Sequence, residues 1–170
     1  EEHYVFDFGI AKPEQTFKFL PGRPIYADGS GCFGDDPSLA TAGLSLVQHI
    51  EGEVRKSVQC CLPEGLPPNA AVAEHFAIVL GSLYTDGPFE MVTDCGSVEK
   101  SGKGGKAYAM NWARPMGGPW YNVRMHDLTI RKTKAHRSYK QAQEEGDTED
   151  WTGNDLADKL AKEAAQYGTP

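Results

Sequence analysis

The sequence predicts one α/β domain, built from a mixed β-sheet with helices packed on its faces. Short apolar segments recur along the chain, several with the alternation of a half-buried strand. Two other segments repeat apolar residues at helical spacing. The chain has 170 residues and 39% apolar content, enough for one substantial core, and no shift in composition indicates a second domain.

Five segments are expected to form the strands. They are Ile25–Asp28, Ala42–Ile50, Val54–Leu62, Phe89–Asp94 and Leu128–Ala135. We assign residues 24–170 to the domain and residues 1–23 to an N-terminal extension or linker. Within that extension, His3–Phe8 has the pattern of an added edge strand, and a linker from a larger polyprotein is the alternative.

Two helices complete the pattern, in the order three strands, helix, strand, helical segment, strand, helix. The first is expected over Ala71–Tyr84, with Asn69 as its N-cap. For the last helix we expect Asn154 as the cap and Asp155 in the first turn, where an acid complements the helix dipole. The stretch 137–152 before it is rich in Gln, Glu and Asp, and we expect a mobile loop.

The net charge of −7 is unevenly distributed. Residues 97–141 hold ten Lys and Arg against two acids, a local charge of +8, so the remainder carries −15. This segregation favours a phosphate-binding side beside an acidic cleft, and an ordinary solvated charged face is the alternative. Four aromatic residues on which bases or sugars can rest lie in the basic stretch. They are Tyr108, Trp112, Trp120 and Tyr121.

Apolar stretches are too short to span a bilayer, and the N-terminus lacks a basic-then-apolar signal pattern. We therefore expect no membrane partner and an intracellular protein, cytoplasmic or nuclear. The four cysteines, Cys32, Cys60, Cys61 and Cys95, show no C-x-x-C spacing, and adjacent Cys60 and Cys61 would point to opposite faces of a strand. Reduced thiols are expected.

Four acidic residues lie in segments that read as strand ends or helices. They are Asp28, Glu74, Asp94 and Asp158. A single carboxylate is usually solvated surface. However, Asp28 and Asp94 each end an apolar run and precede a small residue, which puts charge where a buried strand leaves a sheet. Two such strands and two helices could bring four oxygen donors together on hard divalent cations.

At this point the sequence resembles the ribonuclease H family, type 1 branch, over about residues 24–166. The resemblance rests on Asp28–Ser30, on Thr93–Asp94 after an apolar strand, and on Lys134–His136 followed by residues 153–163. It implies a ribonuclease H-like mixed five-stranded sheet. It also implies two Mg²⁺ ions, with Mn²⁺ as a substitute, and sequence-independent cleavage of the RNA strand of RNA/DNA hybrids. The metal-ligand positions of the family match Asp28, Glu74, Asp94 and Asp158, and its mobile histidine matches His136.

Individual roles follow from this chemistry. We expect Asp28 to bridge two cations, Glu74 and Asp94 to lie on the leaving-group side, and Asp158 near the attacking water. The resemblance suggests that the imidazole of His136 moves protons or helps product release. Mutual repulsion should raise at least one carboxyl pKa in the absence of metal. The expected substrate-binding residues are Ser30, for which an ordinary surface role is equally compatible, and Lys100, Lys103 and Lys106.

Several alternatives stay open. Asp155 stands three residues before Asp158 and could also face the cleft, although the family pattern favours Asp158. In place of an active nuclease, the chain could be a catalytically silent domain of the same fold that binds nucleic acid or protein, or a transposase- or integrase-like nuclease. The four acids argue against the first. Against the second, that class usually completes its site with a late glutamate, whereas here the last helix offers aspartates and follows a histidine loop. A stand-alone enzyme and a fragment of a retrotransposon reverse transcriptase are both compatible with the sequence; we expect a monomer.

Overall fold

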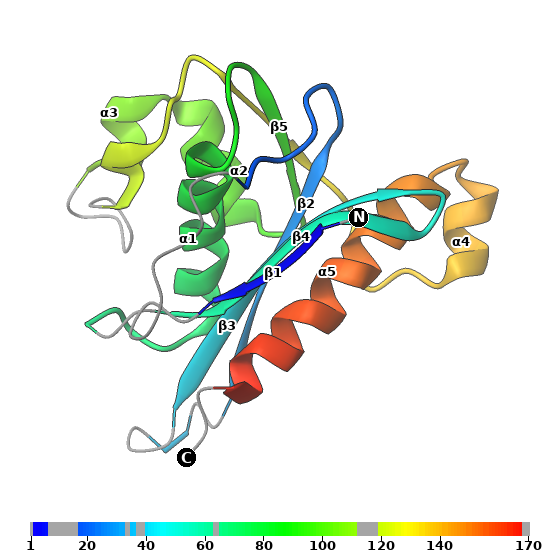
Figure 1. Cartoon of the computed structure of the whole chain (residues 1–170), viewed down its shortest axis with the longest axis horizontal. Helices are drawn as coiled ribbons and strands as arrows, with labels where there is room; N and C mark the ends of the chain where they lie inside the picture. The colour runs from blue at the N-terminus through cyan, green and yellow to red at the C-terminus, as the bar shows by residue number, and fades with distance from the viewer. Residues whose placement is uncertain are drawn as a thin grey trace.

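A computed structural model describes residues 2–6, 17–32, 35–36, 40–62, 65–111 and 119–167 (Figure 1). Its sheet has six strands in the order β1-β4-β3-β2-β5-β6. Their bounds are β1 Glu2–Phe6, β2 Ile25–Cys32, β3 Thr41–Ile50, β4 Glu53–Cys61, β5 Phe89–Thr93 and β6 Leu128–Lys132. The helices are α1 Ala70–Leu83, α2 Gly96–Gly104, α3 Lys106–Ala109, the 3₁₀ helix η1 Pro119–Asn122, α4 Tyr139–Glu144 and α5 Thr148–Tyr167.

The expected mixed five-stranded sheet is confirmed. Strands β2, β3 and β4 form an antiparallel meander, while β5 pairs parallel to β2 and β6 pairs parallel to β5. Strand β2 continues to Cys32, beyond the expected end at Asp28, and β6 ends at Lys132, before the expected end at Ala135. Strand β1 adds a sixth strand, parallel to β4, which agrees with the edge-strand interpretation of this segment.

Helices α1 and α5 cover opposite faces of the sheet (Figure 1). The larger core lies under α1, where Leu44, Leu46 and Ile78 are fully buried. A smaller core under α5 contains Tyr26 and Val47. Successive side chains of a strand point to opposite faces, so Leu46 faces the larger core and Val47 the smaller one. This explains the alternating pattern seen in the sequence of the strands.

Helix α1 begins as expected, since the Asn69 side chain accepts a hydrogen bond from the Val72 N–H at 2.9 Å. The four cysteines are free thiols, and Cys60 is buried while Cys61 is part-exposed. Nowhere in the described residues is there a helix of the length and apolarity that crossing a membrane requires.

The expected start of the last helix was wrong. Helix α5 begins at Thr148, so Asn154 is an interior residue, and its side chain hydrogen-bonds Asp94 instead of capping. The expected loop 137–152 was also wrong, because it contains α4 and the first turn of α5. Ser138 and Gln141 form a reciprocal capping box that starts α4.

Candidate metal centre

The strand register brings two of the predicted ligands to one level. Parallel pairing of β2 with β5 joins Ile25 to Met91 and Tyr26 to Val92. Asp28 and Asp94 each follow two residues later. They therefore lie side by side on neighbouring parallel strands, with Asp94 directly after the end of β5 and Asp28 in the middle of β2.

Gly29 allows Glu74 on α1 to come close to Asp28 and Asp94. A Cβ at Gly29 would lie 2.7 Å from the Ala70 carbonyl oxygen and 2.7 Å from the Glu74 nitrogen, so only glycine lets α1 pack this closely on β2. The Gly29 N–H donates to Glu74 Oε1 at 3.3 Å. The Asp-Gly pair of the sequence thus supplies one ligand and makes room for another.

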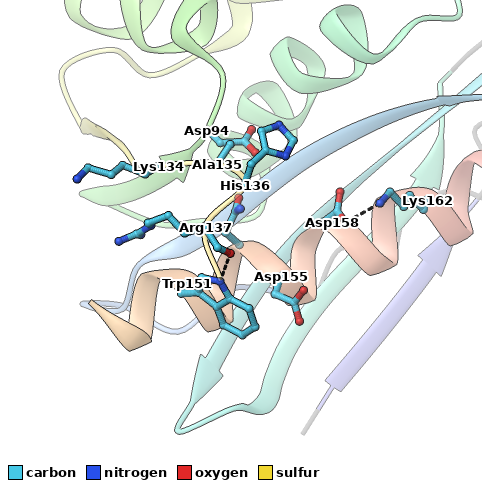
Figure 2. Close-up of a pocket in the computed structure, with 10 residues that line it drawn as sticks. Asp94, Lys134, Ala135, His136, Arg137, Trp151, Asp155, Asp158 and Lys162 are labelled. Atoms are coloured by element: carbon cyan, nitrogen blue, oxygen red, sulfur yellow. Dashed lines mark hydrogen bonds and ion pairs between the residues drawn. The ribbon is translucent and has the colours of Figure 1, made fainter. Parts of the chain in front are cut away.

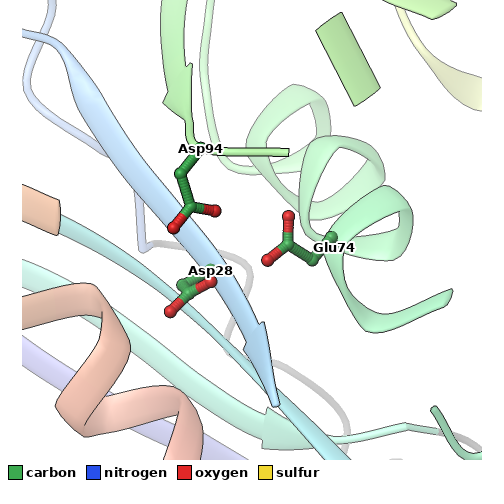
Figure 3. A group of neighbouring side chains, drawn as sticks. All are labelled: Asp28, Glu74 and Asp94. Atoms are coloured by element: carbon green, nitrogen blue, oxygen red, sulfur yellow. The ribbon is translucent and has the colours of Figure 1, made fainter. Parts of the chain in front are cut away.

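Asp28, Glu74 and Asp94 point toward one another (Figure 3), and each offers an oxygen within 4.8 Å of the others. Asp28 is only 4% exposed. Glu74 Oε2 is buried and has no hydrogen-bond partner among the described residues, which is costly unless a ligand satisfies it. Three carboxylates with an unsatisfied oxygen fit a hard divalent cation such as Mg²⁺ or Mn²⁺.

The electrostatics agree with the expected repulsion. Burial, then the neighbouring Glu74 and Asp94, raise the pKa of Asp28 to about 10. Burial also raises the pKa of Glu74 to about 8, against a hydrogen bond with Asp28 that lowers it. The pKa of Asp94 is raised by burial and by Asp158, while His136 and Asn154 lower it. Without metal, the cluster retains protons at neutral pH.

This cluster should make the metal-free protein less stable as the pH rises. The folded-state pKa values of Asp28 and Glu74 lie above those of the unfolded chain. Their contribution to stability is therefore complete below about pH 4 and is lost as the pH rises through about 8 to 10. Asp28→Asn should then raise the free energy of unfolding at pH 9 by roughly 2 kcal/mol, or about 4–8 °C in Tm, measured in chelator.

Near pH 5, Asp28→Asn should raise the free energy of unfolding by less than it does at pH 9. A matched control is Asp86→Asn, because the Asp86 side chain is 85% exposed and pairs with Lys18 far from the cluster. Adding Mg²⁺ should stabilise the wild-type protein more than Asp28→Asn. If Asp28→Asn raised Tm by the same amount at pH 5 and at pH 9, repulsion between the ionised carboxylates would not be what destabilises the metal-free protein.

Asp158 lies beside the cluster rather than within it. A pocket of about 200 Å³ brings together Asp94, His136, Asp155 and Asp158. In Figure 2, the Asp158 carboxylate points toward the side where Asp94 and His136 lie, while the Asp155 carboxylate points away from them, although both residues line the pocket. Asp158 pairs with Lys162 at 2.9 Å, and Asp155 with Lys159 at 2.8 Å. This arrangement favours Asp158 as the fourth acid.

His136 is exposed at the rim of the same pocket. Its φ of 60° places it in the left-handed region, which costs a non-glycine residue about 1–3 kcal/mol. Ser30 follows Asp28 by two residues in β2, so both side chains lie on one face. The three lysines expected to bind substrate are all exposed: Lys100 and Lys103 lie on α2, and Lys106 lies on α3.

Much of the predicted phosphate-binding charge is used internally. Arg124 binds Asp127 together with Ser82 and Thr85, and Arg131 binds Asp150. Trp120 was wrongly expected to meet bases: it is fully buried, and its indole N–H donates to His75 Nδ1 at 3.0 Å. Tyr108 and Tyr121 are exposed, and Lys106 lies over the Tyr121 ring. Trp112 and Arg114 lie outside the described residues.

Sequence reasoning missed two residues beside the cluster. Asn154 was interpreted as a helix cap, and Lys162 was not considered. Each is four residues from Asp158, one turn before or after it, so both share its side of α5. That spacing was the signal available in the sequence.

Comparison with known proteins finds no protein-family model that matches the chain. No curated protein matches it either. Among solved structures, it is similar to the solution structure of the PFV RNase H domain, with a TM-score of 0.62 and 24% identity over 85% of this chain and 94% of that chain. The foamy viral protease-reverse transcriptase in complex with RNA/DNA hybrid gives a TM-score of 0.61 and 20% identity over 93% of this chain and 22% of that chain.

A third similar structure is RNase H1 from the halophilic archaeon Halobacterium salinarum NRC-1. It gives a TM-score of 0.54 and 15% identity over 86% of this chain and 98% of that chain. At such identities the likeness establishes the fold. The resemblance inferred from the sequence is thus confirmed at the level of the ribonuclease H fold.

Proposed function

We propose that this chain, which has the ribonuclease H fold, is a metal-dependent endonuclease that hydrolyses the RNA strand of RNA/DNA hybrids without sequence preference. One observation carries the proposal: Asp28, Glu74 and Asp94 converge within 4.8 Å, and a buried Glu74 oxygen finds no hydrogen-bond partner in the part of the chain that the structure describes. A silent binding domain gains nothing from this arrangement, because clustered buried carboxylates raise one another's pKa and cost stability.

In the proposed mechanism, Asp28, Glu74 and Asp94, with Asp158 at the side, would hold two divalent cations, Mg²⁺ or Mn²⁺. Such cations, when bound, activate a water and stabilise the leaving oxygen of an in-line displacement. Asp28, the most buried of the three, would be the ligand that both cations share. Asp158 lies on the His136 side of Asp94, which suits a ligand near the attacking water. His136 is exposed beside them and can carry a proton to or from solvent.

The proposed substrate path includes the exposed lysines of α2 and α3. Replacing Lys100, Lys103 and Lys106 together with alanine should weaken hybrid affinity and reduce the slope of log K against log salt by about 2 to 3, because fewer counterions are released. Lys103 also pairs with Glu99 at 2.8 Å, so it contributes less than the other two. Fluorescence anisotropy at several salt concentrations measures both quantities. An unchanged salt slope would place the substrate path elsewhere.

A substrate panel in Mg²⁺ tests the proposed function. RNA in an RNA/DNA hybrid should be cut, while the DNA strand, double-stranded DNA and single-stranded RNA should not. Cleavage of double-stranded DNA with strand transfer would instead favour a transposase- or integrase-like enzyme. Binding of the hybrid without cleavage in either Mg²⁺ or Mn²⁺ would favour the silent domain.

The proposal also covers where the protein acts and whether it acts alone. An intracellular hybrid nuclease, cytoplasmic or nuclear and monomeric, can act alone or as one domain of a reverse transcriptase polyprotein. The second setting is supported by the likeness to a foamy viral protease-reverse transcriptase, of which the matched part is 22%.

A further inference from the structure

We propose that Arg137 and Trp151 form a clamp that fixes the strained backbone of His136 beside Asp94, so that both are positioning residues for the proposed cleavage reaction. This inference rests on the proposed function. Residues 137–152, expected from the sequence to form a mobile loop, would instead hold His136 in place. His136 stands in the left-handed region at φ 60°, which costs a residue with a Cβ free energy that contacts of the surrounding structure offset.

Arg137 holds the loop through its side chain. Although it lies next to an exposed histidine, its own side chain is only 7% exposed. One guanidinium nitrogen donates to Asp147 at 2.8 Å, and the other donates to Glu145 at 3.1 Å. Both acids lie between α4 and the start of α5, so Arg137 ties the loop to the helix that carries Asp158. A planar guanidinium suits this two-acid contact better than an ammonium.

Trp151 holds the loop through the backbone. Its indole N–H donates to the Arg137 carbonyl at 2.7 Å, drawn as a dashed line in Figure 2. The Trp151 ring also packs edge-on against Tyr139, with centroids 5.2 Å apart. Helix α5 thereby fixes the peptide that follows Arg137, one residue beyond His136.

The other flank of His136 is tied to the metal centre itself. The Thr133 N–H donates to the Thr93 carbonyl at 2.8 Å, next to Asp94. Arg137 also reaches Thr133 Oγ1, at 3.4 Å. The loop is therefore held on both sides of its one strained residue, and the imidazole has a defined place at the pocket that contains Asp94 and Asp158.

A double-mutant cycle tests the clamp. Arg137→Ala should lower kcat on a hybrid by about 10–10²-fold, with KM changed less than about 2-fold, because misplacement affects the chemical step. When His136 is already alanine, adding Arg137→Ala should lower kcat by less than about 2-fold. Arg137→Lys should recover part of the lost kcat. Trp151→Phe, which removes the indole N–H and reduces the ring system while keeping an aromatic side chain, should lower kcat by about 3- to 10-fold.

The control is Arg23→Ala. Arg23 also approaches the first turn of α5, at Glu149, and binds the His49 carbonyl, but it lies away from His136. This variant should leave kcat unchanged. A second readout needs no activity: in the metal-free protein, Arg137→Ala should lower the heteronuclear NOE of the amides of residues 134–138, and Arg23→Ala should not.

The outcomes separate the two proposals. If wild-type protein cuts no hybrid, the proposed function fails, and the positioning role fails with it. If wild-type protein cuts but Arg137→Ala and His136→Ala act independently, or the loop amides stay as rigid in Arg137→Ala as in wild type, the clamp is overturned while the proposed function stands.

Discussion

Asp28→Asn is expected to reduce cleavage of RNA in a hybrid by at least about 10³-fold while leaving the fold intact, and Asp94→Asn is expected to do the same. Asparagine keeps the shape of the side chain but removes the negative charge with which this residue would hold a cation in the proposed site. Single-turnover rates in saturating enzyme measure the effect. Circular dichroism and Tm check the fold, and Asp28→Asn should unfold at a higher temperature than wild type in chelator.

Asp86→Asn serves as the matched control, since it removes one exposed carboxylate on the same protein. Its single-turnover rate should equal that of wild type. Near wild-type turnover in Asp28→Asn or Asp94→Asn would remove that residue from the proposed metal centre.

Asp158→Asn is expected to cost about 10³-fold or more in rate, whereas Asp155→Asn should cost less than about 3-fold. The reason is position, because Asp158 lies on the Asp94 side of α5 and raises the pKa of Asp94, while Asp155 pairs with Lys159. The two variants make a controlled pair, since each removes one acid from an i,i+4 ion pair on the same helix.

A helix-dipole effect, first expected for Asp155, does not apply. Helix α5 begins at Thr148, so Asp155 lies about two turns inside it, and dipole effects are confined to the first turn. If Asp155→Asn were the inactive variant and Asp158→Asn the active one, the side of α5 that faces the cluster would be misassigned. His136→Ala should fall between the two, at about 10²-fold.

The sequence predicted the elements whose signal is local. Alternation located all five strands of the core sheet, and Asn69 marked the start of α1 because a capping side chain acts within one turn. The ends of apolar runs also pointed to Asp28 and Asp94, although β2 continues to Cys32 and only Asp94 directly follows the end of a strand.

Long-range contacts decided the rest. Asn154 looked like a cap because caps and cluster partners use the same residue type, and only the fold brings it to Asp94. Trp120 was assigned to a binding surface although its indole N–H is satisfied by His75, 45 residues earlier in the chain. Likewise, the acids after α4 suggested a mobile loop, but Asp147 and Glu145 bind Arg137.

The measurement that tests the central claim most directly is the Mg²⁺ dependence of hybrid cleavage by the wild-type protein. A hybrid with 5′-labelled RNA is incubated with protein in chelator and then across a Mg²⁺ titration, and the ends of the product are identified. We predict no cleavage in chelator, cleavage that rises with Mg²⁺, and RNA products that end in a 3′-hydroxyl. Cleavage that persists at full rate in chelator, or RNA products that end in a 2′,3′-cyclic phosphate, would contradict a metal centre formed by Asp28, Glu74 and Asp94.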